Sequence, residues 1–178
     1  METEQEVTQV NAEMRAICED MFPGMACEVG IEVPRSTVQE TIILATMGLG
    51  AEDLRGALLV MAAPAFFRST YPLATPLASP SENEVLDWAG ELANQALGRV
   101  KNRFGTLGCL FSLGIPTVVC GEDMRIDIAV NRPLASLRGR VGDQEVVVVL
   151  QIERTNGGPL FRPNEMTTTV GEGEGFLF

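Results

Sequence analysis

The chain has 178 residues, enough for one domain with a hydrophobic core, and its 46% hydrophobic and 21% charged residues are typical of a soluble globular protein. Its net charge of −11 argues against binding to nucleic acid or to an anionic membrane surface, because like charges repel. The absence of histidine excludes catalytic schemes built on an imidazole base or on a zinc–histidine site.

The cysteines and the amino terminus indicate the cellular compartment. The four cysteines form no Cys-x-x-Cys pair, so a zinc ribbon or a thioredoxin-type site is not indicated. The amino terminus METEQEV is acidic, unlike a secretory signal, and no apolar run approaches the roughly 20 residues of a membrane span. We therefore expect a cytoplasmic protein with reduced cysteines.

The first part of the chain predicts one helix, then strands. Apolar residues recur at helical spacing from Glu4 to Met21, and Pro23-Gly24 ends that pattern. Strands are predicted at residues 26–33, 40–47 and 55–63, with a turn over 48–53; the third is apolar throughout and is expected at the centre of a sheet. Residues 64–71 can form a short helix that starts on a proline, and residues 72–80, with three prolines, form a connector.

Residues 81–104 predict the longest helix of the chain. Ser81 and Glu84 have the spacing of a capping box, and Gly105 is expected to end the helix in a left-handed conformation. One face of this helix is apolar, with Leu86, Ala89, Ala93, Ala96, Leu97 and Val100 at spacings of three and four.

The remaining residues predict further strands and a tail. Strands are expected at 107–112, 115–120, 124–130 and 144–153, with a basic turn region over 132–142. From residue 154 onward the sequence is rich in glycine and threonine and has no periodicity. We therefore predict a folded domain over residues 1–153 and a C-terminal tail over residues 154–178.

The opposite face of the long helix carries a polar stripe. Its members follow each other by three or four residues and therefore share one side of the helix: Glu84, Asp87, Glu91, Asn94, Gly98 and Lys101. Gly98 costs the helix about 1 kcal/mol relative to alanine, which suggests a packing or functional reason for it. By spacing alone, a solvated face with an incidental glycine is the commoner explanation.

Two sequence blocks resemble a known family. The run EVLDWAGELANQALGRVKNRF, followed by SLGIPTVVCGEDMRI, is similar to the CheX chemotaxis phosphatases, which are relatives of CheC and of the FliY-type flagellar switch proteins. The Glu-x-x-Asn pair of that family is present as Glu91 and Asn94, within Gly90–Asn94 and followed by Gly98. Residues 115–119 match its Pro-Thr-Val segment. CheC-type relatives carry two helices with this pair, whereas here the first predicted helix has no Asn three residues after a Glu, which favours CheX over CheC.

The resemblance implies a fold, an activity and partners. It implies an α+β fold: a mostly antiparallel sheet of about six strands with two long helices packed on it, assembled as a homodimer. It also implies hydrolysis of the aspartyl phosphate of a CheY-type receiver, with Asn94 positioning the attacking water and Glu91 contacting the receiver's active-site lysine. No cofactor of its own is expected, since the receiver would supply Mg²⁺. The rest of the stripe becomes the candidate partner-binding surface, although helix-dipole effects also explain Glu84, Asp87 and Lys101.

Other classes of function stay open from the residues alone. The same helix could serve a non-catalytic adaptor that binds a receiver domain or a flagellar switch component. A small-molecule-binding domain is a third possibility, for which the sequence carries no cofactor signature.

Overall fold

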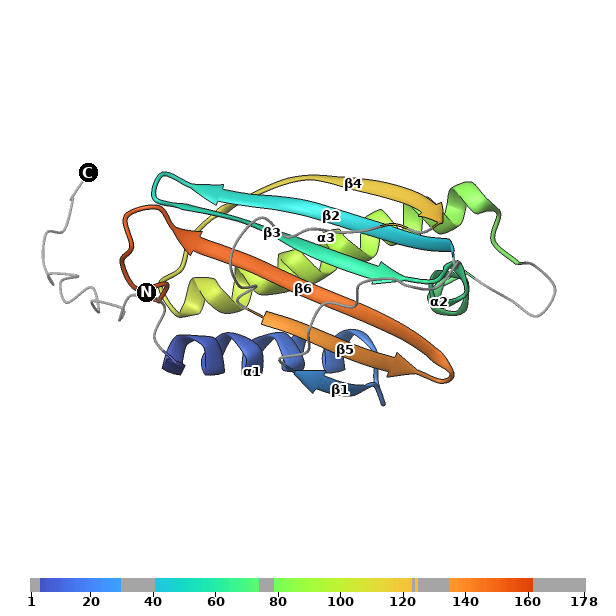
Figure 1. Ribbon diagram of the computed structural model, residues 1–178, viewed down its shortest axis with the longest axis horizontal. Coiled ribbons are helices and arrows are strands. Elements are labelled where there is room, and N and C mark those ends of the chain that lie inside the picture. Colours follow the sequence, from blue (N-terminus) through green and yellow to red (C-terminus); the bar gives the residue numbers. More distant parts are fainter. Residues whose placement is uncertain (1–3, 30–40, 74–78, 123, 125–134, 162–178) are drawn as a thin grey trace, which may run out of the picture.

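The runs that the sequence marks as most apolar lie side by side at the centre of one antiparallel sheet. In the computed structural model, which describes residues 4–29, 41–73, 79–122, 124 and 135–161, β3 (Leu54–Ala62) pairs with β6 (Gln144–Arg154). Outward from this pair lie β2 (Thr41–Ala51) and the edge strand β4 (Ser112–Glu122) on one side, and β5 (Ala135–Val141) and β1 (Ala26–Val29) on the other. The order β1-β5-β6-β3-β2-β4 is antiparallel at every pair (Figure 1).

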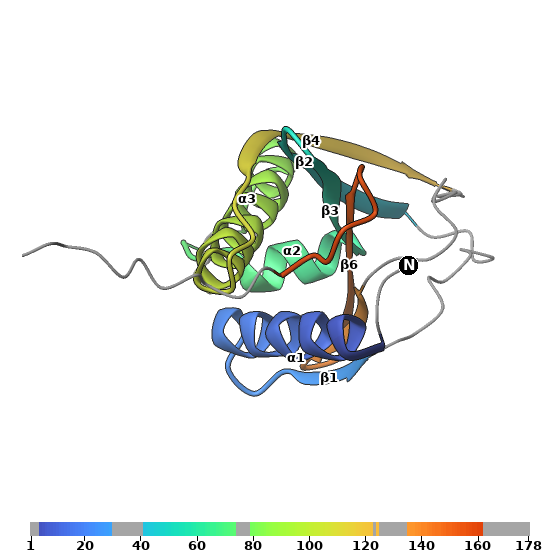
Figure 2. The same cartoon turned by 90° about the vertical axis from the view of Figure 1, so that its left-hand side faces the viewer.

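Three helices cover one face of this sheet. They are α1 (Glu4–Met21), α2 (Pro64–Thr70) and α3 (Glu82–Thr106), and Figure 2 shows all of them on the same side. Alternate residues of the strands point into the core beneath the helices, for example Leu58, Val60, Val148 and Leu150. The structure confirms the expected α+β fold with a six-stranded antiparallel sheet and two long helices, and α2 is a short third helix.

The caps of α3 match the sequence at one end only. At the start, the Ser81 hydroxyl accepts a hydrogen bond from the Glu84 N–H, and the Glu84 carboxylate accepts one from the Ser81 N–H, which completes the capping box. At the other end the prediction for Gly105 is wrong, because the helix continues to Thr106 and the left-handed residue is Gly108, with φ of 77°. The break therefore comes at the next glycine that the chain offers.

The two long helices are joined by ion pairs near their facing ends. Arg103 of α3 donates to Glu13 and Asp20 of α1, at 3.2 and 2.7 Å. On α1, the predicted apolar stripe is confirmed by the buried side chains Val10, Met14, Ile17 and Cys18. The two helices therefore share the core through their apolar sides and meet through charged groups at its border.

Several predicted strand limits are wrong. Residues 107–111 form no strand; Cys109 and Phe111 are buried there, and one strand, β4, replaces the two that were expected. Strand β2 runs on through most of the predicted turn, so that only Glu52 and Asp53 reverse the chain. The expected basic turn over 132–142 contains strand β5, in which Arg138 and Arg140 alternate with residues packed toward the core. The expected strand at 124–130 lies largely outside the described residues.

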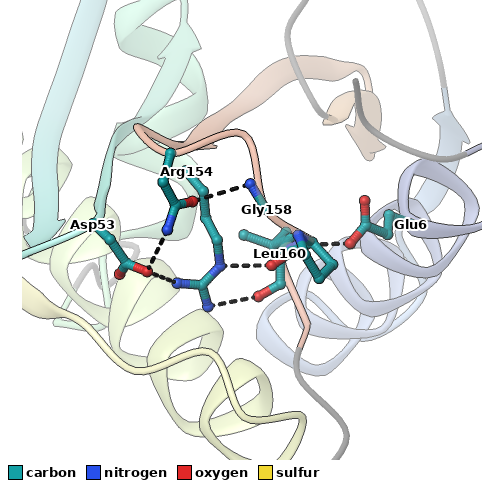
Figure 3. A network of polar contacts seen from close by, with 7 residues as sticks. Glu6, Asp53, Arg154, Gly158 and Leu160 are labelled. Atoms are coloured by element: carbon teal, nitrogen blue, oxygen red, sulfur yellow. Dashed lines mark hydrogen bonds and ion pairs between the residues drawn. The ribbon is translucent and has the colours of Figure 1, made fainter.

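A short segment after β6 packs onto the core (Figure 3). Arg154, whose side chain is 5% exposed, donates to Asp53 and to the carbonyl oxygens of Pro159 and Leu160, at 2.7, 2.6 and 3.0 Å. The Leu160 N–H donates to Glu6 of α1 at 2.6 Å, and its side chain is buried. Phe161 then lies edge-on against Phe104 of α3. We call residues 154–161 the C-terminal clasp.

The clasp bears on the predicted boundary at residue 153. It falls at the beginning of the predicted tail, yet its residues contact the turn between β2 and β3, α1 and α3 through the hydrogen bonds and the ring contact just described. The division into residues 1–153 and 154–178 stays a prediction, and residues 162–178 lie outside the described part.

Candidate functional site

Glu91 and Asn94 lie in the middle of α3, on its exposed side. Their spacing of three residues brings the side chains together, and the Asn94 amide nitrogen donates a long hydrogen bond of 3.4 Å to one Glu91 oxygen. Gln95 donates to the other Glu91 oxygen at 3.0 Å. Two neighbouring amides thus hold the Glu91 carboxylate on the helix surface.

The amide oxygen of Asn94 is available to accept hydrogen bonds from a ligand or from water. The amide nitrogen is directed to Glu91, while within the described part of the chain nothing donates to Asn94 Oδ1. A carboxamide oxygen accepts up to two hydrogen bonds. The pair therefore combines a fixed negative charge with a nearby neutral acceptor, both open to solvent.

Gly90 explains why the site lies close to the sheet edge. A Cβ atom at Gly90 would lie 3.3 Å from a Val118 methyl and 3.8 Å from Pro116 Cβ, so α3 approaches β4 closely at this point. The first motif block thus packs directly on the second, residues 115–119. Leu92 and Ala93 are buried between the two exposed site residues, which accounts for the local Gly-Glu-Leu-Ala-Asn pattern.

Gly98 has no such packing reason. A Cβ atom there would meet none of the described residues within 4 Å beyond the backbone of its own helix, although glycine costs a helix about 1 kcal/mol relative to alanine. It follows Asn94 by one helical turn on the polar stripe. The space above Gly98 is open, as close approach of a partner would require.

The other stripe residues differ in whether they contact other residues of the chain. The carboxylate of Glu84 serves the capping box, and these hydrogen bonds from Ser81 lower the pKa of Glu84. Asp87 and Lys101 are exposed and form no ion pair with any described residue. All six stripe residues lie along one side of α3, and their part in binding a partner stays a prediction.

Beside the stripe lies a groove that the sequence did not reveal. It has a volume of about 300 Å³ and lies between α3, the end of α1, α2 and the end of β5. From α3 it takes Trp88, Leu92, Gln95 and Arg99, which follow each other by four, three and four residues. That spacing was readable in the sequence, but the groove's other walls come from distant segments.

The described residues provide neither a metal-ligand cluster nor a membrane-spanning helix. No three histidine, cysteine, aspartate or glutamate side chains of the described residues gather closely enough to hold a metal ion. Among the described helices, none combines the length and apolar character needed to cross a membrane.

Comparison with known proteins identifies the family. Residues 43–138, more than half of the chain, match the family described as chemotaxis phosphatase CheX, and this match spans both the Glu91–Asn94 helix and the β4 block. A comparison with curated protein sequences gives no match. The chain belongs to the CheX family of chemotaxis phosphatases.

Solved structures share the fold. A chemotaxis protein CheX from Vibrio vulnificus has a TM-score of 0.63 and 16% identity, covering 85% of this chain and 97% of its own. A CheC-like superfamily protein from Shewanella sp. PV-4 has a TM-score of 0.65 and 16% identity, covering 85% and 99%. The CheX–CheY–beryllium trifluoride–Mg²⁺ complex from Borrelia burgdorferi contains a chain with a TM-score of 0.56 and 11% identity, covering 84% and 97%.

Proposed function

We propose that this protein hydrolyses the aspartyl phosphate of a CheY-type response-regulator receiver. The observation that carries this proposal is the exposed Glu91–Asn94 pair on α3, with the Asn94 amide oxygen free, in a chain of the CheX family. A similar fold occurs in a CheX solved together with CheY, beryllium trifluoride and Mg²⁺. That complex supports a receiver as the class of partner.

In the proposed reaction, the receiver and this protein each supply different groups. The receiver supplies the acyl phosphate and its Mg²⁺, which neutralises charge on the transferred group. Water attacks phosphorus, the bond to the aspartyl oxygen breaks, and the free carboxylate and inorganic phosphate carrying both water hydrogens are the products. Asn94 orients the water through its amide, in the way that a glutamine positions water in small GTPases.

Glu91 has a docking role in this proposal. Its carboxylate is held by Asn94 and Gln95 and faces outward, ready to pair with the receiver's active-site lysine. Such a contact fixes the angle at which Asn94 meets the phosphoryl group. A docking contact operates in the ground state and in the transition state alike, so Glu91 should contribute to affinity as well as to rate.

Assembly and location belong to the same proposal. We propose a homodimer that pairs sheet edges, in line with the resemblance. In the described sheet β4 is an edge strand, and its Ile115 is 86% exposed. Long apolar edges favour pairing with another chain. Sedimentation at micromolar concentration should therefore give a mass near twice 19.2 kDa, and a monomer would contradict it. The expected location is the cytoplasm.

The activity is tested by separating chemistry from binding. CheY-type receivers of the same organism are phosphorylated, and single-turnover dephosphorylation is followed with and without the protein. We expect Asn94→Ala to lower the rate by orders of magnitude while affinity for the beryllium-trifluoride-loaded receiver changes only a few-fold. Glu91→Lys should weaken binding as well, most strongly at low salt.

A matched control is available on the same helix. Asn102 is exposed and lies roughly 12 Å along the helix from Asn94, so Asn102→Ala should leave both rate and affinity unchanged. If Asn94→Ala hydrolyses as fast as wild type, the water-positioning role is wrong. A receiver that binds tightly but is dephosphorylated no faster than alone would instead indicate an adaptor.

A further inference from the structure

The groove beside α3 has an apolar floor and one charged side chain. Leu92, Phe22 and Val141 contribute apolar surface, and Trp88 stands along one wall with its indole N–H bonded to the Thr70 hydroxyl. Gln95 donates its amide to Glu91. Of the described residues that line the groove, Arg99 alone is charged.

Arg99 has no carboxylate partner within the described part of the chain. Arg103, one turn further along α3, contacts both Glu13 and Asp20 of α1. Arg99 forms neither a hydrogen bond nor an ion pair there, in a chain whose net charge is −11. A guanidinium presents five N–H donors in a geometry that suits a carboxylate, so Arg99 can bind a carboxylate that enters the groove.

The groove is continuous with the candidate site. Gln95 both lines the groove and bonds Glu91, so the groove begins directly beside the carboxylate of the pair. It lies on the side of the stripe away from β4, which packs near Gly90 on the other side. A protein bound over Glu91 and Asn94 would therefore extend over the groove.

We propose that the groove is a second contact for the receiver: it takes an apolar side chain of the receiver, and Arg99 pairs with a carboxylate beside that side chain. This inference rests on the proposed function for the identity of the partner. Charge complementarity supports this placement of the carboxylate. Glu84, Asp87 and Glu91 on the stripe would repel a carboxylate of the receiver, whereas Arg99 in the groove would attract it. The apolar floor contributes affinity through burial, and Arg99 contributes orientation.

The test compares two arginines with the same substitution. Arg99→Gln removes the charge in the groove, and Arg55→Gln removes an arginine that is paired with Glu153 on β6. Affinity is measured with the beryllium-trifluoride-loaded receiver, and kcat and KM with the phosphorylated one. We expect Arg99→Gln to raise Kd and KM about five-fold, to leave kcat within two-fold, and to lose its effect at high salt.

A second variant addresses the apolar part of the groove. Val141 is partly buried at the end of β5, and Val141→Asn should also weaken receiver binding while the melting temperature shows that the variant is folded. Arg55→Gln should match wild type in every measurement. The proposal is overturned if Arg99→Gln binds the receiver as tightly as Arg55→Gln does.

The outcomes distinguish this inference from the proposed activity. If hydrolysis is normal and does not depend on Arg99, the groove contact is wrong and the proposed activity stands. If the receiver binds in a way that depends on Arg99 but is not hydrolysed, the proposed activity is wrong and the groove contact stands. If indole-3-acetate binds wild type but not Arg99→Gln, and receiver affinity is unchanged, the groove is a small-molecule site and the contact is wrong. If no receiver binds, both proposals fall.

Discussion

Two polar clusters, one in the C-terminal clasp and one on α3, are built in opposite ways. In the C-terminal clasp, the guanidinium of Arg154 is almost fully buried and bonds to Asp53 and two backbone carbonyls. At the candidate site, Glu91 and Asn94 are exposed, bond weakly to each other, and keep acceptor capacity free. A buried charge must be fully satisfied or it destabilises the fold, whereas an exposed one is free to bind a partner.

Stability and activity are therefore expected to depend on separate groups of residues. Changes in the clasp should lower the free energy of unfolding, and changes in the pair should lower the rate of hydrolysis without affecting folding. An effect of the clasp on hydrolysis alone, or of the pair on folding, would contradict this separation of stability from activity.

Removing the clasp should have the largest effect. A chain cut after Arg154 loses Leu160, which is 4% exposed, together with Phe161 and the carbonyls that Arg154 contacts. Burying one leucine contributes about 2 kcal/mol, and the lost aromatic contact and hydrogen bonds bring the expected loss to about 4 kcal/mol. A chain cut after Phe161 should unfold like the full chain. Denaturant unfolding of the two truncations gives the comparison.

A thiol provides a local readout of the same cut. Burial raises the pKa of Cys109 to about 11, so this thiol is neutral and protected at pH 8. Cutting after Arg154 should make Cys109 react with a maleimide well before global unfolding, whereas the exposed Cys120 should react at the same rate in both truncations. Equal protection of Cys109 in both would show that the predicted boundary at residue 153 is right.

The next largest effect should come from Arg154→Met, which keeps the apolar stem and removes the guanidinium. Breaking a buried ion pair leaves groups without partners and costs about 3 kcal/mol. Arg55 is the control, since its pair with Glu153 lies next in register and its side chain is 73% exposed; Arg55→Met should cost at most about 1 kcal/mol. Glu91→Ala and Asn94→Ala should stay within about 0.5 kcal/mol of wild type. Equal losses at Arg154 and Arg55 would contradict a stabilising role for the clasp.

The sequence predicted what depends on neighbouring residues. The capping box of α3, the apolar stripe of α1 and the central place of β3 follow from local spacing, and all three are confirmed. The exposure of Glu91 and Asn94 follows from the same helical period. The binding partner expected for these two residues, in contrast, comes only from the family resemblance.

What the sequence missed depends on contacts between distant segments. Asp53 and Arg154 are separated by 101 residues, so no local pattern marks the ion pair between them. The sequence did not mark Arg99 as part of a site, because the other walls of its groove come from α1, α2 and β5. Strand β5 was missed because its arginines resemble a surface turn, although alternate residues face the core.

The smallest effect, and the one that links the two clusters, is expected from Gly98→Ala. Apart from the backbone of its own helix, no described atom lies within 4 Å of the added methyl group, so the fold should gain up to about 1 kcal/mol from the better helix propensity of alanine. Gly90→Ala is the control, because its methyl group would press on Val118 at 3.3 Å and offset that gain.

Binding should move in the opposite direction from stability at Gly98. If the receiver approaches α3 closely beside Asn94, the added methyl group stands in its way, and affinity for the beryllium-trifluoride-loaded receiver should fall about ten-fold although the protein melts at a higher temperature. A glycine retained at a cost in stability is then explained by the partner alone, since nothing in the described fold needs it. Higher stability with unchanged affinity would mean that Gly98 is incidental and that the receiver contacts the stripe only near Glu91 and Asn94.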